Sequence, residues 1–518
     1  MTSSASTITH ARSSRWFARW ATALFGTLLA TAVCAAPADD MRDLVSRVGP
    51  VLGSASACQG ISPSHIQNVA VKFRAVIKSV SDDAERENLT RQFERNITDG
   101  RNAVTTGKIT CDAVEQQFAG IEQVVSAPAP SSASSSAITP AAQPSVRGVT
   151  DHEIRFGLVA PYTGFSREIG RQIEIGITAA FNRVNDAGGV NGRMLRLIAA
   201  DDGYDPARTL AAVKQLYEKD QVFAFVGNYG TATGAAAMPY LVEHRVLFFA
   251  PFSGGMGFRK NPPDRYIFNY RASYDEEMEA TVRYLLSVRH VQPKQIAVFA
   301  QDDAYGDAGY AGVAKSFRSL GLSDAAILRV NYKRNTVDVD QAVNALRTQK
   351  VPVKAVIMVA TYRAAARFIE KTHDALPGLI YTNTSLVGST QLANELMLLG
   401  PRLASGVIVT QVLPAVGENS SAVLEYKDAL TKYFPNEAAA DYISFEGFAT
   451  AQVLIEGLKR AGPQLDTEKL ISTLEGMRNF DLGVGAPLNL GRAEHQASHE
   501  VWGTVVNNEG KYQPLDLK

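Results

Sequence analysis

The feature that most restricts the possible folds is a regular alternation of strand and helix patterns, which begins near residue 151. Short buried apolar runs are typical of strands, and segments with helical spacing of apolar residues separate them. The expected strands are 154–160, 194–200, 222–226, 246–250, 296–300, 326–330, 355–359 and 379–382. This alternation predicts parallel sheets with helices on both faces. Because there are more strands than one sheet needs, we expect two α/β lobes.

Composition separates these lobes from a smaller N-terminal part. In residues 126–145, seventeen of twenty residues are Ser, Ala or Pro and none is charged, which is the composition of a linker. We place the linker at 126–150, between a small module at 37–125 and the lobes at 151–518. Apolar residues of the module recur at helical spacing, so we expect it to be all-helical and to serve as a docking or spacer module.

The first 36 residues have the order of a secretory signal peptide. Three arginines precede residue 20, an uncharged stretch follows from 20 to 36, and small residues end it. We expect cleavage after residue 35 or 36, which gives a periplasmic protein with a formal charge of 49 minus 52, or −3. A permanent membrane anchor and lipidation of Cys34 are the alternatives that the sequence leaves open.

Removal of the signal peptide would leave two cysteines, Cys58 and Cys111. Two cysteines in an exported chain suggest one disulfide. This disulfide would enclose a loop of about 50 residues and stabilise the module by roughly 4 kcal/mol in the chain-entropy description. A redox role would favour a closer spacing such as C-x-x-C, which the sequence lacks.

Several classes of function are excluded by what the sequence lacks. A formal net charge of zero gives no basic footprint of a nucleic-acid binder. The phosphate loop G-x-x-x-x-G-K-[ST], a G-x-G-x-x-G turn after the first strand and the nucleophile elbow G-x-S-x-G are absent. The pairs Asp201-Asp202 and Asp302-Asp303 follow strands, where we expect them to cap helices and hold turns. We therefore expect neither an enzyme nor a bound metal or cofactor.

Polar residues directly follow the carboxyl ends of the expected strands, and open α/β sheets bind ligands outside these ends. A helix is expected to begin near Thr231, and its free backbone N–H groups with the hydroxyls of Thr231 and Thr233 would suit a carboxylate. Ordinary capping of that helix by Thr231 is the alternative. Ser253 and Gly254 lie in a second small-residue loop after the next strand. The aromatic residues at or just after strand ends, which predict an aromatic-lined cleft, are Tyr162, Tyr229, Phe252, Tyr305 and Tyr362.

At these segments the chain resembles a known family, the periplasmic substrate-binding proteins of branched-chain amino acid (Leu/Ile/Val-type) ABC transporters. The resemblance covers residues 151–518, about 70% of the chain. The matching segments are IRFGLVAPYTG (154–164), FNRVNDAGGVNGR (181–193), DDGYDPARTL (201–210), FVGNYGTATGAAAMPYL (225–241), FFAPFSGG (248–255), IAVFAQDDAYGDAG (296–309) and HEVWGTVVNNEGKY (499–512).

The resemblance implies the type I periplasmic-binding fold, in which two Rossmann-like lobes are joined by three hinge crossovers. We place the crossovers near Ala272-Ser273, Ala404-Ser405 and Phe480-Asp481. Lobe 1 would then comprise about 151–272 and 405–480, and lobe 2 about 273–404 and 481–518. A ligand would lie between the lobes and be enclosed by hinge closure.

The resemblance also implies how a ligand is held. The ligand carboxylate would meet Thr231 and Ser253 in the first lobe, together with the backbone of Ala232 and Gly254. Tyr362 matches a tyrosine supplied by the second lobe.

In the family an acidic residue after a second-lobe strand meets the ammonium of amino-acid ligands. Here the corresponding stretch, 381–385, ends in Thr384 and Ser385 and holds no carboxylate. Because a buried ammonium without a counter-charge is costly, we expect a carboxylate or amide ligand rather than a standard amino acid.

These observations favour a periplasmic solute receptor that passes its ligand to an ABC transporter permease in the inner membrane and that acts as a monomer. A ligand sensor is the alternative, and it would dock on a membrane signalling partner through the helical module. An exported α/β enzyme is a third possibility, but the sequence offers no nucleophile, metal set or cofactor loop for it.

Overall fold

The computed structural model describes residues 38–58, 60–78, 83–126, 146–436 and 439–518. Contacts divide the chain into two compact units, residues 1–143 and 144–518, and each is described by itself. The predicted signal peptide (1–36) and residues 127–145 of the predicted linker lie outside the described residues. No helix among the described segments is long and apolar enough to cross a membrane.

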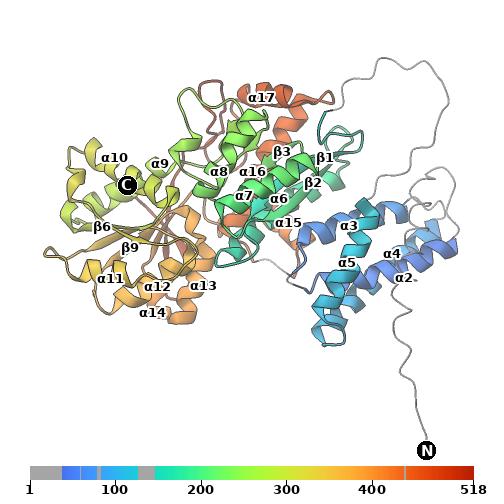
Figure 1. Cartoon of the computed structure of the whole chain (residues 1–518), viewed down its shortest axis with the longest axis horizontal. Coiled ribbons are helices and arrows are strands. Elements are labelled where there is room, and N and C mark those ends of the chain that lie inside the picture. Colours follow the sequence, from blue (N-terminus) through green and yellow to red (C-terminus); the bar gives the residue numbers. More distant parts are fainter. Residues whose placement is uncertain (1–37, 59, 79–82, 127–145, 437–438) are drawn as a thin grey trace, which may run out of the picture. The chain divides into compact units, whose positions relative to one another are not determined.

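The first unit is all-helical in its described residues, which confirms the prediction (Figure 1). Its helices are α2 (Ala38–Ala55), α3 (Pro63–Lys78), α4 (Asp83–Thr105) and α5 (Cys111–Ser126). Phe73 and Phe93 stack with ring centroids 5.1 Å apart in the centre of its small core. A Cβ atom on Gly53 would lie 1.8 Å from the carbonyl oxygen of Ile97, so glycine is needed where α2 and α4 meet backbone to backbone.

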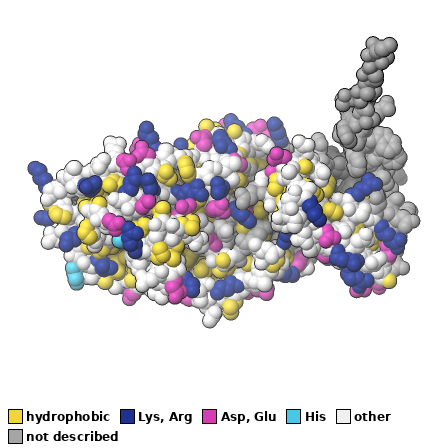
Figure 2. Space-filling model, turned by 90° about the horizontal axis from the view of Figure 1, so that it is seen from below, with side chains coloured by type: hydrophobic (Ala, Val, Ile, Leu, Met, Phe, Trp, Pro, Cys, Tyr) yellow, Lys and Arg dark blue, Asp and Glu magenta, His cyan; other side chains and the backbone are white. Residues whose placement is uncertain are grey.

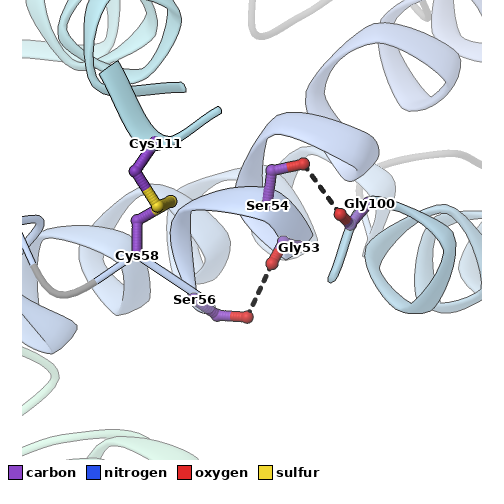
Figure 3. Close-up of a disulfide and its surroundings, with 6 residues drawn as sticks. All are labelled: Gly53, Ser54, Ser56, Cys58, Gly100 and Cys111. Carbon is purple, nitrogen blue, oxygen red and sulfur yellow. Dashed lines mark hydrogen bonds between the residues drawn. A yellow bond between two sulfur atoms is a disulfide. The ribbon is translucent and has the colours of Figure 1, made fainter. Parts of the chain in front are cut away.

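The predicted disulfide joins Cys58 and Cys111 and ties the residues after α2 to the first turn of α5 (Figure 3). Beside it, the hydroxyl of Ser54 donates a hydrogen bond of 2.9 Å to the carbonyl of Gly100 (Figure 3). Both features hold the end of α2, one against α5 and one against α4. The module therefore depends on covalent and polar links as well as on a core of few large side chains.

The second unit contains two sheets, which confirms the prediction of two α/β lobes. The lobe 1 sheet has the order β2-β1-β3-β4-β5 with all strands parallel. Its strands are β1 (Glu153–Ala160), β2 (Met194–Asp201), β3 (Ala224–Val226), β4 (Phe248–Phe249) and β5 (Ile267–Phe268). Its helices are α6 (Arg167–Asp186), α7 (Pro206–Glu218), α8 (Thr231–Glu243), α15 (Ser421–Tyr433), α16 (Tyr442–Ala461) and α17 (Thr467–Glu475).

Alternate side chains of β1 enter the cores on the two faces of this sheet. Leu158 joins the core that contains α6 and α16, whereas its neighbour Val159 joins a second core with Val213 of α7 and Leu241 of α8. Successive residues of a strand point to opposite faces, so a run that is apolar at every position must be covered on both sides. The near-continuous apolar run of β1 therefore fits its central place in the parallel sheet.

The lobe 2 sheet has the order β12-β11-β10-β9-β8-β6-β7. Its strands are β6 (Ile296–Gln301), β7 (Leu328–Tyr332), β8 (Ala355–Val359), β9 (Ile380–Asn383), β10 (Ile408–Gln411), β11 (Trp502–Val506) and β12 (Tyr512–Leu515). Strands β7 to β10 are parallel, and β11 and β12 add an antiparallel edge.

Helices lie on both sides of this sheet, with α9 and α10 on one side and α11 and α12 on the other (Figure 1). The helices of lobe 2 are α9 (Tyr274–Arg283), α10 (Ala304–Ser319), α11 (Asp340–Arg347), α12 (Tyr362–His373), α13 (Ser389–Leu399) and α14 (Pro401–Ala404). Short helical turns of the second unit are η1 (Met256–Phe258), η2 (Tyr284–Val288), η3 (Pro293–Gln295), η4 (Asp324–Ala326) and η5 (Ser385–Val387).

Two of the three lobe crossovers lie later in the chain than the sequence suggested. The chain does not leave lobe 2 near Ala404-Ser405, because the next strand, β10, still pairs with β9 and β11 of lobe 2. It returns to lobe 1 after β10, where α15 packs on α6. Nor does it leave lobe 1 near Phe480-Asp481. Residues 495–498 still run beside β5, where the N–H of Asn269 donates to the carbonyl of His495 at 2.7 Å and β11 follows.

We expect reduction of the Cys58–Cys111 disulfide to destabilise the helical unit and to leave residues 144–518 unaffected. The cysteines are 53 residues apart, and opening such a loop returns about 4 kcal/mol of conformational entropy to the unfolded chain. Calorimetry of the whole protein with and without reductant, and of Cys58→Ser, should show one unfolding transition that moves to lower temperature. If the unfolding temperature of the helical unit did not change on reduction, this prediction would be wrong.

Candidate functional site

The first predicted site residues that the structure brings together are Thr231 and Ser253. Both are buried, and their hydroxyl oxygens share a hydrogen bond of 2.8 Å. Helix α8 begins at Thr231, with Gly230 as its N-cap in a backbone conformation of φ 101°. The hydroxyl of Thr231 therefore does not cap the helix, and the capping alternative is wrong. It lies instead 3.3 Å from the phenol oxygen of Tyr274.

A second pair of hydroxyls lies in lobe 2. The phenol oxygen of Tyr305 is 2.6 Å from the hydroxyl of Thr384, which follows β9. The rings of Tyr274 and Tyr305 contact each other with centroids 5.5 Å apart. Burial raises the pKa of Tyr274 to about 12, so its phenol stays protonated and able to donate. These contacts connect the hydroxyl pair of lobe 1 to that of lobe 2.

The two lobes also touch directly at this junction. The side chain of Gln301, at the end of β6, donates to the phenol oxygen of Tyr204 at 3.1 Å, and Asn335 donates to the carbonyl of Gly203 at 3.0 Å. The ring of Tyr204 packs at a tilt against that of Tyr229, with centroids 5.1 Å apart, and Tyr204 has the unusual φ of 59°. The sequence did not single out Tyr204, because it lies in a turn after a strand rather than at a strand end.

The remaining aromatic candidates lie around this junction. Phe252 is fully buried and its backbone pairs with that of Tyr229. Tyr362, at the start of α12, is almost fully buried. Burial raises the pKa of Tyr362, and the carboxylate of Glu168 in lobe 1 raises it further. Tyr162 is half-buried and lies within lobe 1, where burial and the Glu174 carboxylate raise its pKa.

Asp201 and Asp303 have the structural roles that we expected of the paired aspartates. Asp201 accepts hydrogen bonds from the N–H groups of Tyr162 and Gly203 at 2.8 and 2.9 Å. Asp303 caps α10 and forms an ion pair of 2.9 Å with Arg334. Among the described residues, no group of three or more His, Cys, Asp or Glu side chains is arranged to hold a metal ion.

A buried charged cluster that the sequence did not indicate lies beside Ser385. Arg271, at the first crossover, is 1% exposed and lies 3.0 Å from Glu446 of α16 in lobe 1. Its Nη2 also donates to the hydroxyl of Ser385 at 2.7 Å. Ser385 in turn donates to Glu277 of α9 from its N–H at 2.8 Å and from its hydroxyl at 3.0 Å. Thr410 of β10 donates to the same carboxylate.

This cluster places a carboxylate where the sequence suggested that none would meet a ligand ammonium. The stretch 381–385 holds no carboxylate, but the fold brings Glu277 to it from α9. Burial raises the pKa of Glu446 to about 7, against the opposing effect of Arg271. Burial lowers the pKa of Arg271, but the charges of Glu446 and Glu277 outweigh it and the net shift is upward. The sequence gives a signal for only one of these three residues, because Glu446 is the one charged residue in the largely apolar stretch 442–455, whereas Arg271 and Glu277 lie among other polar residues.

Two cavities lie in the second unit. One of about 680 Å³ is lined by residues of the stretch 475–500, including Arg478, Leu488 and Arg492. The other, of about 340 Å³, lies beside Glu276 and His499 and is also lined by Arg259. Neither contains a predicted site residue. Elsewhere the visible surface carries charges of both signs interspersed (Figure 2), as the zero net charge suggests.

Comparisons with known proteins identify relatives of this architecture. A family described as periplasmic binding protein matches residues 153–511. The Leu/Ile/Val-binding protein homolog 3 of Brucella melitensis is 25% identical over 336 residues, which cover 64% of this chain and 86% of that protein. The crystal structure of a possible leucine/isoleucine/valine-binding protein from Rhodopirellula baltica has a TM-score of 0.67 and 32% identity, and the match covers 71% of this chain and 97% of that one.

A branched-chain amino acid ABC transporter protein from Thermus thermophilus, solved with bound valine, has a TM-score of 0.62 at 18% identity. That match covers 71% of this chain and 96% of that one. At this level of identity the likeness concerns the fold alone. The type I periplasmic-binding architecture that the sequence implied is thus confirmed.

We expect Glu446→Gln to remove a pH dependence of stability. The pKa of Glu446 is about 7 in the folded protein and about 4.5 in an unfolded chain. Between these values the native state holds a proton that the unfolded state has lost, so the free energy of unfolding falls as pH rises from about 4.5 to about 7. The difference between wild type and variant should change by about 3 kcal/mol over this window.

Urea unfolding between pH 4 and 8 would measure this difference. Glu456→Gln is the matched control, because Glu456 lies on the same helix and pairs with Arg460 at 2.7 Å near the surface. If the free energies of unfolding of wild type and Glu446→Gln changed in parallel with pH, the expectation would be wrong.

Proposed function

Because the chain belongs to the periplasmic binding protein family, we propose that it is an extracytoplasmic receptor that delivers a small solute to an ABC transporter. Its family and relatives are substrate-binding proteins, not enzymes. The predicted signal peptide, 1–36, would direct its export to the periplasm. The lobes would close on the ligand by rotation at the crossovers, because only contacts with both lobes favour the closed state. The partner would be an inner-membrane permease, with the receptor acting as a monomer.

The hydroxyl pair of Thr231 and Ser253 is the observation that carries the proposed ligand class. Both hydroxyls are buried at the start of α8, where the N–H groups of the first helical turn have no intrahelical acceptor. The backbone of Ala232, Thr233 and Gly254 adjoins them in sequence. Hydroxyl and N–H donors at a helix N-terminus suit a carboxylate or an amide oxygen. The ligand would therefore be a small solute that presents such a group to lobe 1.

The aromatic side chains around the junction would contact the rest of the ligand. They come from both lobes, with Tyr229 and Phe252 in lobe 1 and Tyr305 and Tyr362 in lobe 2. Thr384 would act on the ligand indirectly, by holding the phenol of Tyr305, and Ser385 would act through its hydrogen bond with Arg271 of the charged cluster. A ligand of this kind would need an apolar body and an oxygen-rich end.

We expect carboxylates with apolar bodies to bind and Thr231→Val to weaken them. Hexanoate, 4-methylpentanoate and 3-phenylpropanoate serve as probes, and their primary alcohols serve as matched ligands without the carboxylate. Loss of one buried hydroxyl that contacts the ligand should lower the affinity about 10-fold or more, since a hydrogen bond to a charged group contributes about 1.5–3 kcal/mol. Titration calorimetry on the mature protein measures the affinities.

Ser253→Ala should have the same effect as Thr231→Val. Ser316→Ala is the control, because the Ser316 hydroxyl is also buried but donates only within α10, to the carbonyl of Gly312. Equal losses in Ser253→Ala and Ser316→Ala would contradict the proposed carboxylate site, as would alcohols that bind as well as the acids.

The transporter role predicts that cells lacking this protein lose uptake of its ligand. The ligand would first be identified by native mass spectrometry of the purified protein, and its labelled form would then be offered to the cells. We expect uptake to return with the wild-type gene and to stay at least 10-fold lower with Thr231→Val at low solute concentration. Unchanged uptake in the deletion strain would argue against this role.

A further inference from the structure

The guanidinium of Arg271 lies between two buried carboxylates at the lobe junction. On the lobe 1 side its Nε is 3.0 Å and its Nη2 is 3.1 Å from the carboxylate oxygens of Glu446. On the lobe 2 side it reaches Glu277 through the hydroxyl of Ser385, which accepts from Nη2 at 2.7 Å and donates to Glu277 at 3.0 Å. Both carboxylates are almost fully buried, so a cation between them is needed to offset their desolvation.

One nitrogen of the same guanidinium, Nη1, makes no hydrogen bond to the two carboxylates or to Ser385. This nitrogen is buried and has no hydrogen-bond partner among the described residues. The guanidinium carbon lies 6.0 Å from the centroid of the Phe252 ring. Burial raises the pKa values of Tyr229 and Tyr274, and the charge of Arg271 opposes this effect for both. The positive charge therefore acts on the side where the candidate ligand residues lie.

A ligand ammonium would need a carboxylate that is free to meet it. Glu277 already accepts from the N–H and the hydroxyl of Ser385 and from Thr410. Glu446 already faces Arg271. An ammonium placed next to Ser385 would lie beside a guanidinium that cannot give up its proton, and like charges in a buried site repel each other strongly. The chain itself thus supplies the cation that these carboxylates require.

We propose that Arg271 is a specificity-determining residue, a built-in cation that makes the lobe junction select carboxylates or amides without an ammonium group. The inference rests on the proposed function and names the substrate class of that same site. The unused Nη1 donor would meet an oxygen of the ligand, whereas an amino acid would bring a second cation to the cluster.

The test compares acids with the amino acids of the same skeleton. The pairs are 4-methylpentanoate with L-leucine, hexanoate with L-norleucine and 3-phenylpropanoate with L-phenylalanine. For the wild type we expect each acid to bind at least 10-fold more tightly than its amino acid in titration calorimetry. Amino acids that bind as tightly as the acids, or more tightly, would overturn the role of Arg271 but leave the receptor function intact.

Arg271→Met tests the residue itself. Without the guanidinium, Glu277 and Glu446 lack a cation, and a ligand ammonium can take its place. We expect the ratio of acid to amino-acid affinity to fall at least 10-fold, while Arg271→Lys keeps the preference for acids. A purely structural role would weaken both members of each pair equally, and an unchanged ratio in Arg271→Met would overturn the proposal.

Glu277→Gln gives a second test, which does not require Arg271→Met to fold. It removes one negative charge from the cluster and keeps the shape of the side chain, so the ratio should shift further toward the acids, by about 3-fold or more. A ratio that stays unchanged or shifts toward the amino acids would overturn the proposal. Binding of neither acids nor amino acids by the wild type would reject the proposed function itself, and the inference with it.

Discussion

The burial of one guanidinium at the junction of the lobes constrains much of the second unit. Arg271 leaves lobe 1 at the first crossover, and its charge is stable there only while Glu446 of lobe 1 and the Ser385–Glu277 pair of lobe 2 lie beside it. Strands and helices from both lobes must therefore meet in one arrangement for the charges to be balanced. The crossover thus belongs to the charged cluster at the junction and is not only a connection between two folded bodies.

The parallel sheets explain why candidate ligand residues gather at this place. The loops after β3 and β4 supply Thr231 and Ser253, and the loop after β9 supplies Thr384 and Ser385. Because the carboxyl ends of parallel strands lie at one edge of each sheet, the two edges can face each other across the crossovers. Hydroxyls and aromatic rings from both lobes thus lie next to each other. Under the proposed function, a solute that bound both sides would stabilise the closed arrangement of the lobes.

Strand positions and the expected site loops were predictable because they depend on local patterns. The apolar run of β1, the glycine before Thr231 and the spacing of the cysteines are each visible in a short stretch of sequence. The crossovers were not predictable in the same way. The run 407–411 reads as a strand, but only its pairing with β9 and β11 shows to which lobe it belongs. The stretch 495–498 likewise reveals its lobe only through its pairing with residues 269–270, which directly follow β5.

By itself the sequence determined the class of the fold, the helical module with its disulfide, and the loops that carry Thr231, Ser253 and Ser385. Only the tertiary structure decided which charges surround those loops. Glu277 and Glu446 are 169 positions apart on two helices, and Arg271 lies in a turn. The apolar stretch around Glu446 indicates that it is buried, but nothing local shows which charges meet it. Their role arises because folding removes water from all three at once, so that the guanidinium of Arg271 becomes the counter-charge that both carboxylates require.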